Sequence, residues 1–204
     1  MGKTTERQEE INRKRRAENL MMLLADNFKN GDWYLTLTYR ETPDREKVQK
    51  DFEKFKRNMR DWLKRRNIPF RYIGIVENLS GRGRPHCHIL IPAVLEYAQL
   101  INRVEDIWPH GRVKAEPYRG GALDAKKMSD YFTKEKVEKR AGGVQTSKNL
   151  LRRPPTKKKI TRAQTYKDEI KAPRGYRVIR ELSYNAYTTE GYPIQVAYFE
   201  KMRC

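Results

Sequence analysis

The sequence predicts an α+β fold in which helices pack on an antiparallel sheet. After an N-terminal helix, the expected elements follow one another as strand, helix, strand, strand, helix, strand, helix. The first strand alternates apolar and hydroxyl residues, as a strand with one buried face does. The next two strands are separated by a short loop with two glycines, which is typical of a hairpin. A split β-α-β arrangement is the simplest fold with this order.

The individual elements follow from hydrophobic periodicity and turn residues. Residues 33–39 (WYLTLTY) form the alternating strand, and residues 44–66 form a helix whose apolar residues recur at helical spacing. Residues 70–77 and 85–91 form the hairpin. Further along, the pattern predicts a short helix, a short strand and a second long helix at residues 95–107, 111–116 and 124–141.

The two ends of the chain differ in character from the middle. The pattern of residues 4–28 predicts a charged helix whose apolar residues lie in its second half. We therefore expect only this second half to pack against the rest of the protein. Residues 140–173 contain ten basic and two acidic residues, a net charge of +8, which is typical of a linker or a nucleic-acid-binding arm. Residues 176–184 and 193–199 predict a terminal hairpin. We therefore expect a helix at 1–30, a central domain at 31–141, and a basic linker with a hairpin at 142–204.

The composition indicates a polyanionic partner. Among 204 residues, 45 are Lys or Arg and 26 are Asp or Glu, which gives a formal net charge of +19 and favours nucleic acid. Two cysteines cannot make a disulfide framework or a zinc finger, and they fit a reducing cytoplasm. No apolar run is long enough to span a membrane, so no membrane partner is expected. The GKT at residues 2–4 lacks the strand and glycine that a phosphate loop needs, so we expect no ATP.

One pair of residues points to a metal. His86 and His88 flank Cys87 on a predicted strand, so both imidazoles project from one face and the thiol from the other. Glu77 ends the partner strand and can add a carboxylate across the hairpin. Two imidazoles and a carboxylate suit Mn²⁺ better than Mg²⁺. On spacing alone, a polar strand face explains the two histidines equally well.

A second candidate pair lies on the last predicted helix. Tyr131 and Lys134 are three residues apart, so they share a helix face about one turn apart. A phenol beside an ammonium group can attack and hold a phosphate. The alternative is that Tyr131 is simply one of twelve tyrosines, placed on an amphipathic helix.

Three motifs taken together resemble a known family. LTLTY (35–39), PHCHILI (85–91) and YFTK (131–134) occur in the order seen in HUH endonucleases, and the chain looks most like the single-tyrosine rolling-circle replication initiators (Rep) of small single-stranded DNA phages and plasmids. The WPHG segment at 108–111 also resembles a stretch of that group. The resemblance implies an antiparallel, five-stranded, RRM-like HUH core. It also implies Mn²⁺ or Mg²⁺ held by His86, His88 and Glu77, and Tyr131 as the nucleophile.

The resemblance further implies a replication initiator that nicks and rejoins single-stranded DNA at an origin through a 5′-phosphotyrosine. Lys134 would assist Tyr131, and we expect the DNA backbone to contact six residues, Thr36, Thr38, Arg82, Arg84, Lys126 and Lys127. Host helicase and polymerase are possible partners, in a bacterial cytoplasm. Two alternatives stay open, which are a single-tyrosine HUH transposase and a non-catalytic module that binds single-stranded nucleic acid.

Overall fold

The structure is a computed structural model that describes residues 5–78, 83–134, 143–154 and 169–202. The chain divides into two compact units, Met1–Arg152 and Arg153–Cys204. The first unit contains a five-stranded sheet in the order β4-β1-β3-β2-β5, in which every neighbouring pair is antiparallel. Its strands are β1 (Trp33–Thr38), β2 (Ile73–Glu77), β3 (His86–Ile91), β4 (Val113–Pro117) and β5 (Gln145–Thr146). The α+β prediction and its antiparallel sheet are confirmed.

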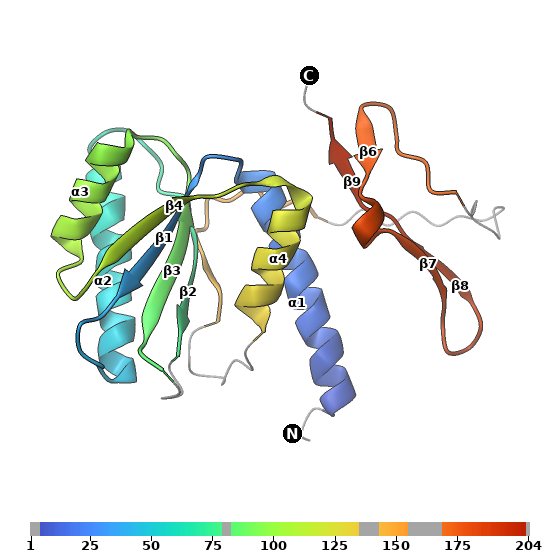
Figure 1. The fold of residues 1–204 in the computed structure, drawn as a ribbon, viewed down its shortest axis with the longest axis horizontal. Helices are drawn as coiled ribbons and strands as arrows, with labels where there is room; N and C mark the ends of the chain where they lie inside the picture. The colour runs from blue at the N-terminus through green and yellow to red at the C-terminus, as the bar shows by residue number, and fades with distance from the viewer. Residues whose placement is uncertain (1–4, 79–82, 135–142, 155–168, 203–204) are drawn as a thin grey trace. The chain divides into compact units, whose positions relative to one another are not determined.

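Helices cover both faces of this sheet (Figure 1). On one face lie α2 (Arg45–Lys64) and α3 (Tyr97–Ile107), and on the other lie α1 (Glu6–Asn27) and α4 (Gly121–Thr133). Asp44 caps α2, because its carboxylate accepts a hydrogen bond from the backbone N–H of Lys47 at 2.8 Å. None of the described helices combines the length and apolar character that crossing a membrane requires.

The main hydrophobic core lies between the sheet and α2 with α3. Every second residue of β1 and β3 points into it, including Leu35, Leu37, Cys87 and Ile89, all of which are fully buried. The helices contribute the apolar stripe that the sequence predicts, with Val48, Phe52, Phe55, Met59, Trp62 and Leu63 from α2. The alternation leaves the other residues of β1 and β3 on the opposite face, where α4 lies.

The first helix docks through its second half, as its sequence predicts. Ala17, Leu20, Met21 and Leu24 are buried, whereas residues 5–11 are exposed. Its neighbour is α4, with which it makes most of its helix contacts. The two run side by side in opposite directions (Figure 1). The helix that carries Tyr131 therefore packs against the N-terminal helix, which is about 100 residues away in sequence.

The segment 108–111 packs against the end of β1 and is hydrogen-bonded to it. The indole N–H of Trp108 donates a hydrogen bond to the carbonyl oxygen of Thr38 at 2.9 Å, and the backbone N–H of Arg40 donates to the backbone carbonyl oxygen of His110 at 2.9 Å. Gly111 passes so close to β1 that an added Cβ would lie 2.2 Å from the Thr38 carbonyl oxygen. The WPHG sequence is thus explained by packing, with an indole as donor and a glycine where no side chain fits.

We expect Gly111→Ala to destabilise the first unit by about 1–3 kcal/mol, because the methyl group has to displace the backbone of β1. Urea denaturation measures this loss. The control is Arg112→Ala, whose side chain is exposed and whose change we expect to stay within about 0.5 kcal/mol. Equal stability of Gly111→Ala and the wild type would show that the close approach is absent.

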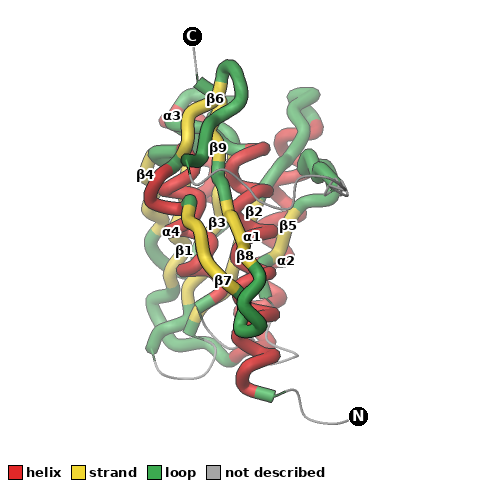
Figure 2. The backbone as a smooth tube through the Cα atoms, turned by 90° about the vertical axis from the view of Figure 1, so that its right-hand side faces the viewer, coloured by secondary structure: helices red, strands yellow, loops and turns green. Residues whose placement is uncertain are grey.

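Several boundaries differ from those predicted. The tyrosine helix begins at Gly121 rather than 124 and is described to Thr133, and residues 135–142 lie outside the described part. Leu123 in the first turn of this helix is exposed, although it is apolar. Within the basic segment, Gln145–Thr146 form β5 against the edge of β2. Figure 2 shows β5 beside β2. Two polar residues give no strand signal, so the sequence could not predict this pairing.

The described part of the second unit contains two small antiparallel ribbons (Figure 2). β7 (Tyr184–Tyr187) pairs with β8 (Pro193–Val196), and β6 (Tyr176–Val178) pairs with β9 (Phe199–Lys201). The sequence predicted a single hairpin of 176–184 with 193–199. The structure divides that hairpin into two ribbons, because the 3₁₀ turn at Arg180–Leu182 interrupts its first strand.

Candidate metal and tyrosine site

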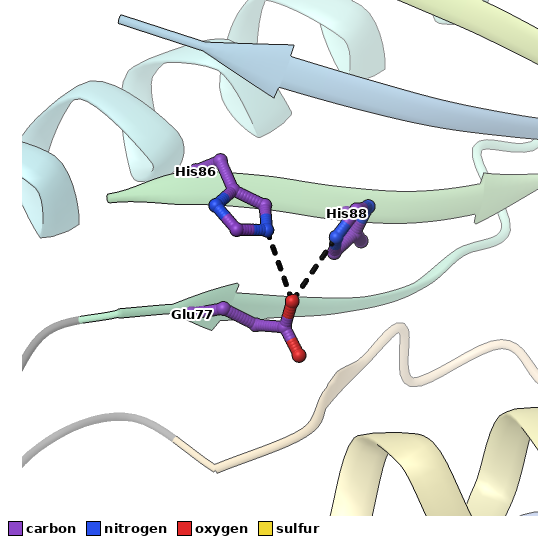
Figure 3. A group of neighbouring side chains, drawn as sticks. All are labelled: Glu77, His86 and His88. Atoms are coloured by element: carbon purple, nitrogen blue, oxygen red, sulfur yellow. Dashed lines mark hydrogen bonds and ion pairs between the residues drawn. The ribbon is translucent and has the colours of Figure 1, made fainter. Parts of the chain in front are cut away.

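The hairpin of β2 and β3 brings together the three predicted metal ligands (Figure 3). Glu77 is the register partner of His86, and His88 lies two residues further along the same face. The Nε2 atoms of His86 and His88 lie 3.0 Å and 3.1 Å from the same carboxylate oxygen, Oε2 of Glu77. One ligand atom from each residue lies within 4.8 Å of the others, so a single ion can reach all three.

Glu77 is ionised at neutral pH. Burial by itself would raise the pKa of this carboxyl, but the neighbouring side chains of His86, His88 and Tyr131 outweigh burial and hold the pKa well below its usual range. An ionised carboxylate is the form that binds a cation. The Glu77 carboxylate therefore places a negative charge beside both imidazoles.

The surroundings of the two imidazoles leave their Nε2 atoms suited to binding a metal ion. The Nδ1 of His86 lies 3.1 Å from the carbonyl oxygen of Arg84, which can only accept a hydrogen bond. In the tautomer with the proton on Nδ1, this carbonyl accepts it and the Nε2 lone pair is free to bind a cation beside Glu77. The Nε2 of His88 is buried, and the Glu77 carboxylate lies 3.1 Å from it. Both nitrogens thus suit metal ligation.

The helix α4 delivers Tyr131 to the same carboxylate. The phenol donates a hydrogen bond to Oε2 of Glu77 at 2.7 Å, across 54 positions of sequence. Its ring lies edge-on to His88, with the ring centres 6.2 Å apart, and the side chain remains 45% exposed. Phe132, the next residue, is buried. The structure therefore holds the phenol beside the candidate metal ligands and leaves it partly exposed to solvent.

The first strand lies alongside the site with Tyr34, Thr36 and Thr38. Thr36 is the register partner of His88, and its hydroxyl lies 3.1 Å from Nδ1 of that ring. Thr38 is the partner of His86, but its hydroxyl is bonded to the backbone of Arg112 at 3.0 and 3.1 Å. The Tyr34 ring stacks on His88. Sequence reasoning noted both threonines as candidate DNA contacts but gave Tyr34 no role.

The lysines and arginines that were predicted to contact DNA differ in exposure and in their ion-pair partners. Lys134 ends α4 and is exposed, and Lys127 is also exposed on that helix. Lys126 is paired with Asp130. Arg84 is exposed beside the site, while Arg82 lies outside the described residues. His110 is not part of the metal cluster and instead lies 3.5 Å from Asp51. Contact between these cations and DNA stays a prediction.

The comparison with family models gives a match over the sheet and the tyrosine helix. The model of the replication-associated protein ORF2/G2P matches residues 32–136, which include β1, the metal cluster and Tyr131. This is just over half of the chain. The chain belongs to the replication-associated protein ORF2/G2P family. Comparisons with curated proteins and with solved structures found no match.

Membership of the ORF2/G2P family supports a role in DNA replication of the initiator type. The matched region ends just beyond Lys134, so it contains the complete candidate site. The replication-associated protein thus carries, in one compact unit, a cluster that can hold a metal ion and a tyrosine in direct contact with that cluster.

Proposed function

We propose that this protein nicks and rejoins single-stranded DNA at a replication origin, with Tyr131 as the nucleophile and a divalent cation held by His86, His88 and Glu77. The observation that carries the proposal is the hydrogen bond of 2.7 Å between the Tyr131 phenol and a carboxylate oxygen that both imidazoles also face. A nucleophile and a metal-binding cluster in contact are the two parts that a metal-assisted phosphoryl transfer needs.

The residues would act in a defined order. The bound cation would polarise the scissile phosphate and stabilise the negative charge that develops on it. The Tyr131 oxygen would attack phosphorus and lose its proton to water, which reaches the phenol because its side chain is exposed. The bond from phosphorus to the 3′ oxygen would break, and that oxygen would take a proton from water to become a free 3′-OH. The product is a 5′-phosphotyrosine, which a 3′-OH can attack in reverse without ATP.

Lys134 is a candidate for holding the phosphate. It follows Tyr131 by about one turn and its ammonium group is exposed. Its contribution would be electrostatic, because a positive charge near the phosphate stabilises the transition state without forming a bond. The metal of choice is Mn²⁺, because two imidazoles bind it better than they bind Mg²⁺.

Two features favour this function over the alternatives. The family match names a replication-associated protein, which favours an initiator over a transposase. Both faces of the five-stranded sheet carry helices (Figure 1). A non-catalytic module of the RRM type instead stacks bases on an uncovered sheet face. The test is to incubate the protein with single-stranded origin oligonucleotides and Mn²⁺, and to look for a covalent adduct on a denaturing gel.

The basic segment is proposed to add affinity without sequence preference. Lys157, Lys158 and Lys159 lie in it, outside the described residues. Changing all three to Gln should weaken single-strand binding and flatten the slope of log K against log salt by about 2, at about 0.7 for each lost phosphate contact. Fluorescence anisotropy at several salt concentrations measures the slope.

The matched control for this charge change lies on α2. Lys50, Lys54 and Lys64 are exposed there, on the face of the sheet opposite the site. Changing these three to Gln removes the same charge and should leave the slope nearly unchanged. If the two triple variants give the same slope, the basic segment makes no specific contribution to DNA binding.

A further inference from the structure

The imidazole of His88 is held from two directions by the first strand. At one ring nitrogen, the Thr36 hydroxyl lies 3.1 Å from Nδ1. Against its face, the Tyr34 ring is stacked at 5.1 Å between centres, with 13° between the ring planes. Thr36 and Tyr34 lie two residues apart on β1, so they project from the same face of the sheet as His88. The ring of His88 therefore has little freedom to turn.

We propose that Thr36 and Tyr34 are positioning residues that prepare His88 to bind the metal. The inference rests on the function proposed above and concerns its metal site. When the Thr36 oxygen accepts a hydrogen bond from Nδ1–H, the proton is fixed on Nδ1 and the Nε2 lone pair is directed toward Glu77. The stacked Tyr34 ring keeps the imidazole in the plane that this bond requires. Neither side chain needs to touch the metal or the DNA.

Thr38 shows that the position of Thr36 is specific. Both threonines are on β1, both face the site side of the sheet, and each lies opposite one of the two histidines. Their hydroxyl groups nevertheless differ in partner, since Thr38 bonds to the backbone of Arg112 and not to an imidazole. The other histidine, His86, has the carbonyl of Arg84 at its Nδ1 instead. Of the two threonines, Thr36 is the one whose hydroxyl reaches a candidate ligand.

Tyr34 also connects the metal cluster to the tyrosine helix. Its ring lies 6.4 Å from that of Phe132, measured between centres, and Phe132 adjoins Tyr131 on α4. The ring of Tyr34 is thus packed between His88 and the helix that carries the phenol. A smaller side chain at position 34 would release both neighbours at once, whereas phenylalanine would keep the ring contacts.

The test is a titration of the full-length protein with Mn²⁺, in which electron paramagnetic resonance measures the free ion. We expect Thr36→Val to weaken Mn²⁺ binding by about 10- to 100-fold, because valine has the same shape but no hydroxyl. Thr36→Ser should restore most of the affinity. Thr42→Val, a change at an exposed threonine outside the site, is the control and should bind within about two-fold of the wild type.

Substitution of Tyr34, whose ring stacks on His88, gives an independent test by the same Mn²⁺ titration. We expect Tyr34→Leu to weaken Mn²⁺ binding by about three- to ten-fold, in line with the loss of an aromatic pair, and Tyr34→Phe to bind as the wild type does. Thermal unfolding of each variant shows whether it is folded. This arm decides the question if Thr36→Val does not fold.

The outcomes separate the inference from the proposed function. If the wild type binds Mn²⁺ and both Thr36→Val and Tyr34→Leu bind it equally well, the positioning role is overturned and the metal site stands. If the wild type itself does not bind Mn²⁺, the proposed metal site fails, and the positioning role fails with it. Loss of affinity in Thr36→Val that Thr36→Ser does not reverse would also overturn the role of the hydroxyl.

Discussion

Replacing Tyr131 with Phe should abolish the covalent DNA adduct and lower cleavage of a single-stranded origin oligonucleotide by about 10³-fold or more. The change removes one oxygen and keeps the ring, which packs near His88 and Phe132. Folding and DNA binding should therefore survive, the second because it depends mainly on phosphate contacts. A denaturing gel and an anisotropy titration measure the two properties.

The position of the adduct is checked by mass spectrometry of the wild-type protein. Trypsin should release the nucleotide on the peptide 128–134, which contains Tyr131 as its one tyrosine. Tyr97→Phe is the matched control, because it removes an exposed phenol from α3 on the other face of the sheet, and its adduct should form normally. An adduct on another tyrosine, or cleavage by Tyr131→Phe at the wild-type rate, would refute the assignment.

Loss of the Glu77 charge should have the second large effect. Glu77→Gln keeps the size of the side chain but removes the negative charge that faces both imidazoles, so Mn²⁺ binding should weaken by about 100-fold and nicking should fall by about 10³-fold. His86→Ala and His88→Ala should abolish nicking with only a modest loss of DNA affinity. Calorimetric titration with Mn²⁺ and a nicking assay measure these effects.

Glu105→Gln provides the control for this charge change. Glu105 is exposed on α3, on the opposite face of the sheet, so its loss should change neither Mn²⁺ binding nor nicking. Chelation with EDTA should stop nicking by the wild type, and added Mn²⁺ should restore it. Nicking that persists in Glu77→Gln or in EDTA would contradict the metal site.

Local sequence patterns predicted the elements that form the site. Alternation placed β1 and β3 correctly, and the two-residue period put His86 and His88 on one face with Cys87 on the other. The hairpin loop set the pairing that brings Glu77 opposite His86. These predictions succeeded because each depends on residues close together in the chain.

The features that the sequence left open depend on packing between distant segments. The contact of Tyr131 with Glu77 needs α4 to lie on one particular face of the sheet, and no local period specifies this face. The pairing of α1 with α4 and of β5 with β2 likewise joins segments far apart in sequence. Tyr34 was missed because an aromatic residue on a strand is usually core, although its place opposite His88 follows once the register is known.

The position of Cys87 has a consequence for the chemical robustness of the site. This thiol lies between the two histidines in sequence but is fully buried in the core on the other face of the sheet, and burial raises its pKa well above the usual range. A protonated, inaccessible thiol reacts poorly with alkylating agents and oxidants. Oxidants that modify exposed thiols should therefore leave the strand that carries both imidazoles intact.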